Sequence, residues 1–208
     1  MEKNKKIKLL VCAAYFFSYI ARQGYSASLT EIICNLGVTK SLAGVAVTGS
    51  FITYGLFQII SGIIGDKFEP EKIVFVGLFG SSLANLFVCI FPDIYVMNVL
   101  WCINGIFQSL IWPPIVRILV DELGVKEYSL TVVRLTQASY ASTILVYILA
   151  PIIIKLLNWR FVFALFGLFA LCFSFVWITK TKKIMSECRA KSISVELENV
   201  EFSNIPKE

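Results

Sequence analysis

Apolar residues recur along this chain in windows that are separated by short polar connections. Each window is roughly 20 residues long, the length that crosses the hydrocarbon core of a bilayer as a helix. The pattern therefore predicts an all-α membrane protein with six transmembrane helices. Their expected bounds are Leu9–Ile33, Leu42–Ile64, Ile73–Phe91, Ile94–Val120, Ser129–Ile154 and Phe161–Thr179.

The two ends of the chain differ from these windows. Lysines between positions 3 and 8 give a basic start, but the apolar run that follows is longer than a signal-peptide core, carries Arg22 and lacks a clear cleavage site. The first window is therefore expected to be retained as a span. Residues 1–180 are predicted to form one six-helix bundle, and residues 181–208 a charged cytoplasmic tail without a core of its own.

A polar stripe runs along the first window. Tyr15, Tyr19, Arg22 and Ser26 are spaced by four, three and four residues, which places them on one face of a helix. An arginine stays charged in a protein and is costly in hydrocarbon unless it faces a polar interior. The stripe therefore predicts the wall of a water-filled cavity, and its cation predicts that the cavity receives an anion.

The fourth window carries a second polar face. Asn104, Gln108 and Trp112 are spaced by four, next to Pro113 and Pro114. Prolines within a membrane helix bend it where neighbours or water satisfy the freed carbonyls. The alternative is that Asn and Gln form hydrogen bonds between helices.

The first half of the fifth window is polar, and Ser139 there is expected to face the same cavity. Arg134, in the same half, is expected to extend toward the cytoplasmic interface, as long basic side chains near a membrane boundary do.

Composition and charge narrow the class of protein. Hydrophobic residues make up 57% and charged residues 16%, more apolar surface than a soluble domain of this size can bury. The absence of histidine removes the usual metal ligand and general base, so no catalysis, metal or cofactor is expected. The net charge of +5 reflects basic residues gathered at alternate span ends, which predicts two cytoplasmic termini in the cell's inner (plasma) membrane and no nucleic-acid partner.

Several short motifs resemble those of one family of membrane proteins. They are Gly62-xxx-Asp66-Lys67 between spans two and three, Trp159-Arg160 before span six, Phe107-Gln108 followed by Trp112-Pro113-Pro114, Tyr54-Gly55, and Arg22 preceded by Tyr19 and Tyr15. With these motifs the chain resembles the N-terminal half of a major facilitator superfamily transporter, and within it the organophosphate:phosphate antiporter branch, which includes the glycerol-3-phosphate transporter.

The resemblance implies a carrier that moves a small organic anion, such as an organophosphate, by alternating access between two six-helix halves. It implies that Arg22 helps bind the substrate phosphate, with a second arginine contributed by the other half, and that Gly62, Asp66 and Lys67 belong to a loop involved in gating. The substrate-binding residues that it implies are Arg22, Tyr15, Tyr19, Tyr54, Gln58, Gln108, Trp112 and Ser139.

Departures from the family pattern bear on the substrate. Gln23 and Gln58 stand where members such as the glycerol-3-phosphate carrier have lysines, Ser139 stands in place of a histidine, and Glu69 stands where a loop glycine is usual. A dianionic phosphate is therefore expected to be held less strongly, and a monoanion or a more polar, neutral-tailed substrate becomes an alternative.

A transporter of this kind has twelve spans, whereas the windows provide six. The chain is expected to be a fragment or a truncated product, with a separately encoded second half or a homodimer as alternatives. The bilayer, a small anion and a second six-helix unit are its expected partners. Two further functions stay open, a membrane sensor of sugar phosphates and an inactive remnant.

Overall fold

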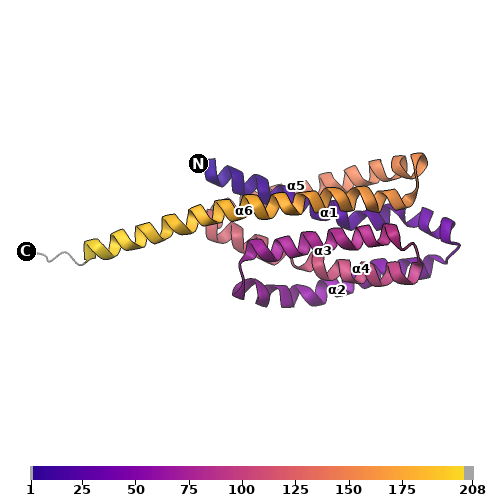
Figure 1. Cartoon of the computed structure of the whole chain (residues 1–208), viewed down its shortest axis with the longest axis horizontal. Helices are drawn as coiled ribbons and strands as arrows, with labels where there is room; N and C mark the ends of the chain where they lie inside the picture. Colours follow the sequence, from indigo (N-terminus) through magenta and orange to yellow (C-terminus); the bar gives the residue numbers. More distant parts are fainter. Residues whose placement is uncertain (1, 204–208) are drawn as a thin grey trace, which may run out of the picture.

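The computed structural model describes the backbone of residues 2–203 and the side chains of residues 3–65, 67–124, 127–184 and 186. Over this part of the chain, helices alternate with short connections, and they run side by side along one axis (Figure 1). The all-α prediction is confirmed. The helices are α1 Glu2–Leu36, α2 Lys40–Lys67, α3 Pro70–Ile90, α4 Ile94–Ser109, α5 Trp112–Leu156 and α6 Trp159–Ser203.

Five segments of the described chain are long and apolar enough to cross a membrane. They are Lys40–Gly65, Pro70–Ile90, Ile94–Gly124, Glu127–Leu156 and Trp159–Ile184. The helix α1 is not among them, because polar residues such as Arg22 lower its mean hydropathy. It nevertheless lies within the bundle, where Ile20 packs in one buried cluster with Val146 of α5 and Phe166 of α6.

The fourth predicted span is divided between two helices. The helix α4 ends at Ser109, and α5 begins at Trp112 with proline in its first turn. Proline lacks a backbone N–H, and the first turn of a helix is where that donor has no helical partner. The bend predicted at the proline pair is therefore confirmed as a break in the helix. Farther along α5, Gly124 has a φ of 74° and separates the fourth crossing from the fifth.

Polar side chains connect neighbouring helices inside the bundle. The hydroxyl of Tyr25 in α1 donates to the carbonyl of Ala43 in α2 at 3.0 Å. The amide of Asn85 in α3 donates to the carbonyl of Ala21 in α1 at 2.8 Å. All four residues are buried, and hydrogen bonds of this kind join helices in a medium where apolar contact alone gives little preference between protein and lipid.

The sixth helix is longer than the sequence predicts. Its apolar span was expected to end at Thr179, whereas α6 continues to Ser203 and extends past the other helices (Figure 1). No proline or glycine occurs between positions 180 and 203, so no residue of that stretch interrupts the helical backbone. The predicted tail therefore begins as a continuation of the last helix.

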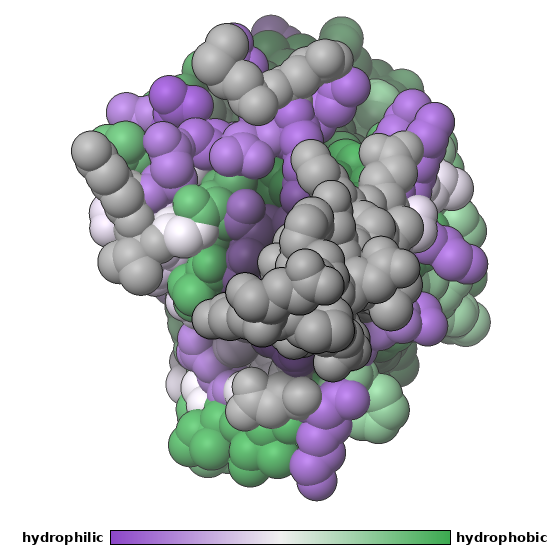
Figure 2. All heavy atoms as spheres, turned by 90° about the vertical axis from the view of Figure 1, so that its left-hand side faces the viewer, coloured by the Kyte–Doolittle hydropathy of each residue, from purple (hydrophilic) through white to green (hydrophobic). Residues whose placement is uncertain are grey.

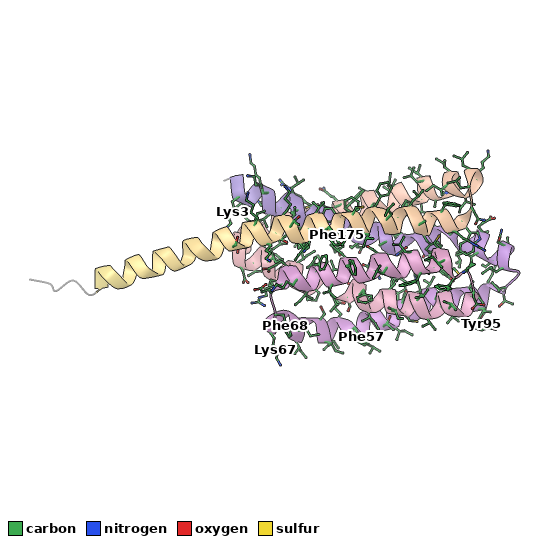
Figure 3. The ribbon with its side chains drawn as sticks, in the orientation of Figure 1. Lys3, Phe57, Lys67, Phe68, Tyr95 and Phe175 are labelled. Carbon is green, nitrogen blue, oxygen red and sulfur yellow. The ribbon has the colours of Figure 1, made fainter. Side chains whose placement is uncertain are left out.

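Basic residues gather at one end of the bundle. Lys3 and Lys67 lie there, whereas Tyr95 lies at the opposite end (Figure 3). Figure 2 looks onto the end that carries Lys3, and hydrophilic residues cover much of that face. This distribution agrees with the charge pattern on which the orientation in the membrane was predicted.

Two ion pairs at this end join the start of α1 to α5. Lys3 Nζ lies 2.9 Å from Glu122 Oε2, and Lys8 pairs with Glu127. The two carboxylates flank Gly124, so the N-terminal turns of α1 bridge the bend in α5. Partly exposed pairs of this kind contribute little free energy, and their effect is to fix the position of α1 relative to the bend.

Candidate anion-binding site

Arg22 lies in the middle of α1 with its guanidinium against a group of aromatic rings. The guanidinium carbon is 4.6 Å from the ring centre of Tyr54, 5.0 Å from that of Phe51 and 5.9 Å from that of Tyr19. A cation over a ring face at these distances is attracted by the ring quadrupole. Among the described side chains no carboxylate pairs with Arg22. The positive charge is therefore held in place by rings and keeps its capacity to bind an anion.

The aromatic group continues along α1 to the start of α5. The ring centres of Tyr15 and Tyr19 are 5.0 Å apart, and those of Tyr15 and Trp112 are 5.4 Å apart. Five of the predicted residues, Arg22, Tyr15, Tyr19, Tyr54 and Trp112, thus lie in one continuous set of contacts. The spacing along α1 places Tyr15 and Tyr19 on the same face as Arg22. Packing of α2 and α5 against α1 adds Tyr54 and Trp112.

A buried hydrogen-bond network lies behind this group. The side-chain amide of Gln108 donates to the carbonyl of Ser18 at 3.0 Å and to the hydroxyl of Ser81 at 2.7 Å. The same Ser81 hydroxyl donates to Asn104 Oδ1 at 2.5 Å. Gln108, Ser81 and Asn104 are all buried, so α4 is joined to α1 and α3 by side-chain amides. Asn104 and Gln108 thus form hydrogen bonds between helices, which was the alternative stated for them in the sequence analysis.

A small crevice separates the arginine from this network. Its volume is about 10 Å³, enough for about one water molecule, so a substrate would bind over its mouth and not within it. The residues that line the crevice are Arg22, Ser50, Tyr54, Trp101, Asn104, Gly105 and Gln108.

Two predicted site residues lie elsewhere in the arrangement. Ser139 on α5 is buried, and its hydroxyl donates to the carbonyl of Thr136 at 2.8 Å. Gln58 on α2 is partly buried and lies one helical turn beyond Tyr54. Neither residue is among those that line the crevice beside Arg22.

The predicted gating loop forms the turn between α2 and α3. Lys67 is exposed and lines a groove of about 530 Å³ together with residues of α3 and Leu110, whereas Gly62 faces open space. The side chain of Asp66 lies outside the described residues. Arg117 of α5 donates to the carbonyls of Gly65 and Phe68. These hydrogen bonds satisfy backbone acceptors at the C-terminal end of α2.

Sequence reasoning missed two residues beside Arg22. Phe51 and Ser50 precede Tyr54 by three and four residues, which places them on the same side of α2. That spacing was available in the sequence. It gave no distinct signal, because a phenylalanine and a serine are common on any apolar helix of a membrane bundle.

Residues 11–193 match the family described as Major Facilitator Superfamily, and the chain therefore belongs to that superfamily. Its six-helix arrangement agrees with a solved structure, a peptide transporter POT in complex with sulfate. The two superpose with a TM-score of 0.70 at 16% identity, over 95% of this chain and 45% of the other, and this likeness concerns the fold alone. The predicted architecture of half a superfamily fold is confirmed.

The names of two relatives refer to phosphorylated compounds. A probable hexose phosphate transport protein of Chlamydia trachomatis is 25% identical over 168 residues, covering 81% of this chain and 37% of the relative. A glycerol-3-phosphate transporter of Bacillus subtilis is 24% identical over 196 residues, covering 88% of this chain and 43% of the relative. The resemblance to the organophosphate:phosphate antiporter family is confirmed by these relatives, of whose length the chain spans less than half.

Proposed function

We propose that this chain is one half of a secondary transporter that moves a small organic anion across the inner membrane by alternating access, without catalysing a reaction. The observation that carries the proposal is the placement of Arg22 in mid-helix, packed on three aromatic rings with no carboxylate partner among the described residues. An uncompensated cation in a membrane span is costly and is typical of substrate and ion pathways. The names of the relatives support an anion of the organophosphate class.

The proposal includes a second six-helix unit. In this bundle the crevice beside Arg22 has room for about one water molecule, and Phe51, which contacts Arg22, is exposed; both observations fit one wall of a cleft. Transporters of this architecture hold their substrate between two repeats near the bilayer midplane. The second unit is provided by a further part of the same protein, by a separate chain or by a second copy.

We expect the purified chain, as a monomer in proteoliposomes at pH 5, to bind glycerol-3-phosphate without transporting it, because one wall of a cleft cannot alternate between two openings. The measurement is uptake of the radiolabelled compound beside equilibrium binding, with the oligomeric state determined by mass in detergent. Empty liposomes are the control. Robust uptake by a proven monomer would overturn the half-transporter proposal, and absence of binding would overturn the assignment of an anion site.

Both termini are proposed to be cytoplasmic. The basis is the lysines near both ends of the chain, at positions 3–8 and 180–183, together with the placement of Lys3 and Lys67 at the same end of the bundle (Figure 3). Reporter fusions are expected to give a cytoplasmic signal at Glu208 and an extracytoplasmic signal in the connection at positions 37–39. An extracytoplasmic reporter at Glu208 would contradict the six crossings.

A sensor of sugar phosphates is the second candidate function. The membrane sensor protein UhpC of Escherichia coli is 28% identical over 116 residues, covering 56% of this chain. A carrier that includes its second six-helix unit takes up labelled substrate into cells, whereas a sensor changes a signalling output in cells without net uptake. Measuring both in one strain separates the two functions.

A further inference from the structure

Arg22 is the single charged residue among those that line the crevice at the proposed site. Its neighbours there are neutral, namely the hydroxyls of Ser50 and Tyr54, the amides of Asn104 and Gln108, Gly105 and the Trp101 ring. Ser50 already donates to the carbonyl of Val47 at 2.8 Å. The described residues of this wall therefore present one positive charge to a ligand.

The other charged residues of α1 lie far from Arg22 along the helix. Lys8 is fourteen positions before Arg22, about 21 Å at 1.5 Å per residue, and it pairs with Glu127. Arg134 of α5 is not among the residues that line the crevice beside Arg22. In the other direction the next charge on α1 is the carboxylate of Glu31. None of these supplies a second cation at Arg22.

Neither of the two amides that line the crevice can replace a missing cation, because an amide carries no charge. Gln108 has two N–H donors, and they are used by the carbonyl of Ser18 and the hydroxyl of Ser81. The guanidinium is therefore the one group lining this crevice that can neutralise a charge on the ligand. A guanidinium neutralises one negative charge in a bidentate pair, whereas a second negative charge would remain uncompensated in a site of low dielectric constant.

We propose, building on the anion-carrier function above, that this wall of the site selects anions with one negative charge. The ligand class comprises sulfonates, carboxylates and singly ionised phosphate monoesters. Doubly ionised phosphate monoesters bind this wall more weakly, because their second negative charge has no cation on it.

The pH dependence expected of this site resides in the ligand. The titratable groups that contact Arg22 are the phenols of Tyr19 and Tyr54, with Tyr15 beside them. The neighbouring residues of α4 and α5, Asn104, Gln108 and Trp112, do not titrate, and the chain has no histidine. Between pH 5 and 8 a phosphate monoester passes through its second ionisation, near pH 6, while a sulfonate keeps one charge.

The test compares glycerol-3-phosphate with 2,3-dihydroxypropane-1-sulfonate, which has the same carbon skeleton and a fixed single charge. Binding to the purified chain in zwitterionic nanodiscs is followed by tryptophan fluorescence, since Trp101 and Trp112 flank the site. We expect the dissociation constant of the phosphate ester to rise about 50- to 100-fold from pH 5 to pH 8, as its monoanion falls from about 90% to about 1%. That of the sulfonate is expected to change less than about 2-fold, since its charge is constant.

A variant tests the same inference at fixed pH. Gln58→Lys places a cation one turn from Tyr54 and is expected to improve binding of the phosphate ester at pH 8 by about 10-fold or more, since a tenfold gain needs only a single added ionic contact. Binding of the sulfonate should improve less, so the ratio of the two affinities is the readout.

The outcomes separate this inference from the function on which it rests. If the phosphate ester binds equally well or better at pH 8, the selection for a single charge is wrong and the anion-carrier function stands. If neither compound binds at any pH while thermal unfolding shows a folded protein, both proposals fail.

Discussion

Replacing Arg22 by alanine is expected to weaken binding of glycerol-3-phosphate at pH 6 by about 10- to 100-fold, the equivalent of one charge-assisted hydrogen bond or more. The physical reason is that the guanidinium is the one charged group lining the crevice, and neighbouring Gln108 has both amide hydrogens engaged. Arg22→Lys is expected to lose about 10-fold, because an ammonium keeps the charge and loses the bidentate geometry. Isothermal titration or fluorescence measures both.

Arg160 provides a matched control. Its guanidinium also lies over an aromatic ring, with the guanidinium carbon 5.7 Å from the ring centre of Trp159. Unlike Arg22, however, Arg160 is exposed at the start of α6. Arg160→Ala should leave ligand affinity within about 2-fold, as surface substitutions away from a site do. If Arg160→Ala and Arg22→Ala weaken binding equally, the loss of affinity does not arise at the proposed site around Arg22.

A stability measurement distinguishes a binding role for Arg22 from a structural one. A cation without an acidic partner costs free energy in a membrane interior, so Arg22→Ala is expected to keep or raise the melting temperature of the purified chain. Loss of binding together with a retained melting temperature is the signature of a residue kept for its ligand. A lower melting temperature in parallel with weaker binding would make Arg22 a structural residue.

Gly105→Ala is expected to destabilise the bundle by about 1 to 3 kcal/mol, the usual cost of overpacking a buried helix contact. A Cβ at this position of α4 would clash with the carbonyl oxygen of Ser50 and the hydroxyl of Thr53 in α2. Backbone cannot move aside as a flexible side chain does, so α2 has to shift away from α4. Thermal unfolding monitored by gel filtration gives the change.

The displacement of α2 should also reach the proposed site. Phe51 and Tyr54 follow Ser50 on α2 and hold the guanidinium of Arg22, so Gly105→Ala is expected to weaken anion binding as well. Gly55→Ala is the control, because a Cβ at Gly55 meets no atom within 4 Å. That variant should be neutral or stabilised by about 0.5 to 1 kcal/mol, the preference of a helix interior for alanine over glycine. Equal melting temperatures for the two variants would contradict this account.

The sequence alone determined the helical class, most helix boundaries and the face of α1 that carries Arg22. These features depend on local quantities: the length of an apolar window, the missing N–H of Pro113 and Pro114, and the 3.6-residue repeat. The aromatic stripe of Tyr15 and Tyr19 was predicted for the same reason, since residues on one helix have fixed relative positions. Arg22 was visible as well, because charged residues in the middle of apolar windows are rare.

Only the tertiary structure decided which residues of other helices complete that face. Gln108 and Ser81 engage each other across α4 and α3, so an amide expected to bind substrate is also part of a network between helices. Phe51 contacts Arg22, and Gly105 packs tightly while Gly55 faces open space, although both are glycines within apolar helices. The reason is physical: periodicity fixes the face on which a residue lies, while the rotation and separation of two helices fix its partner, and they depend on the packing of all six.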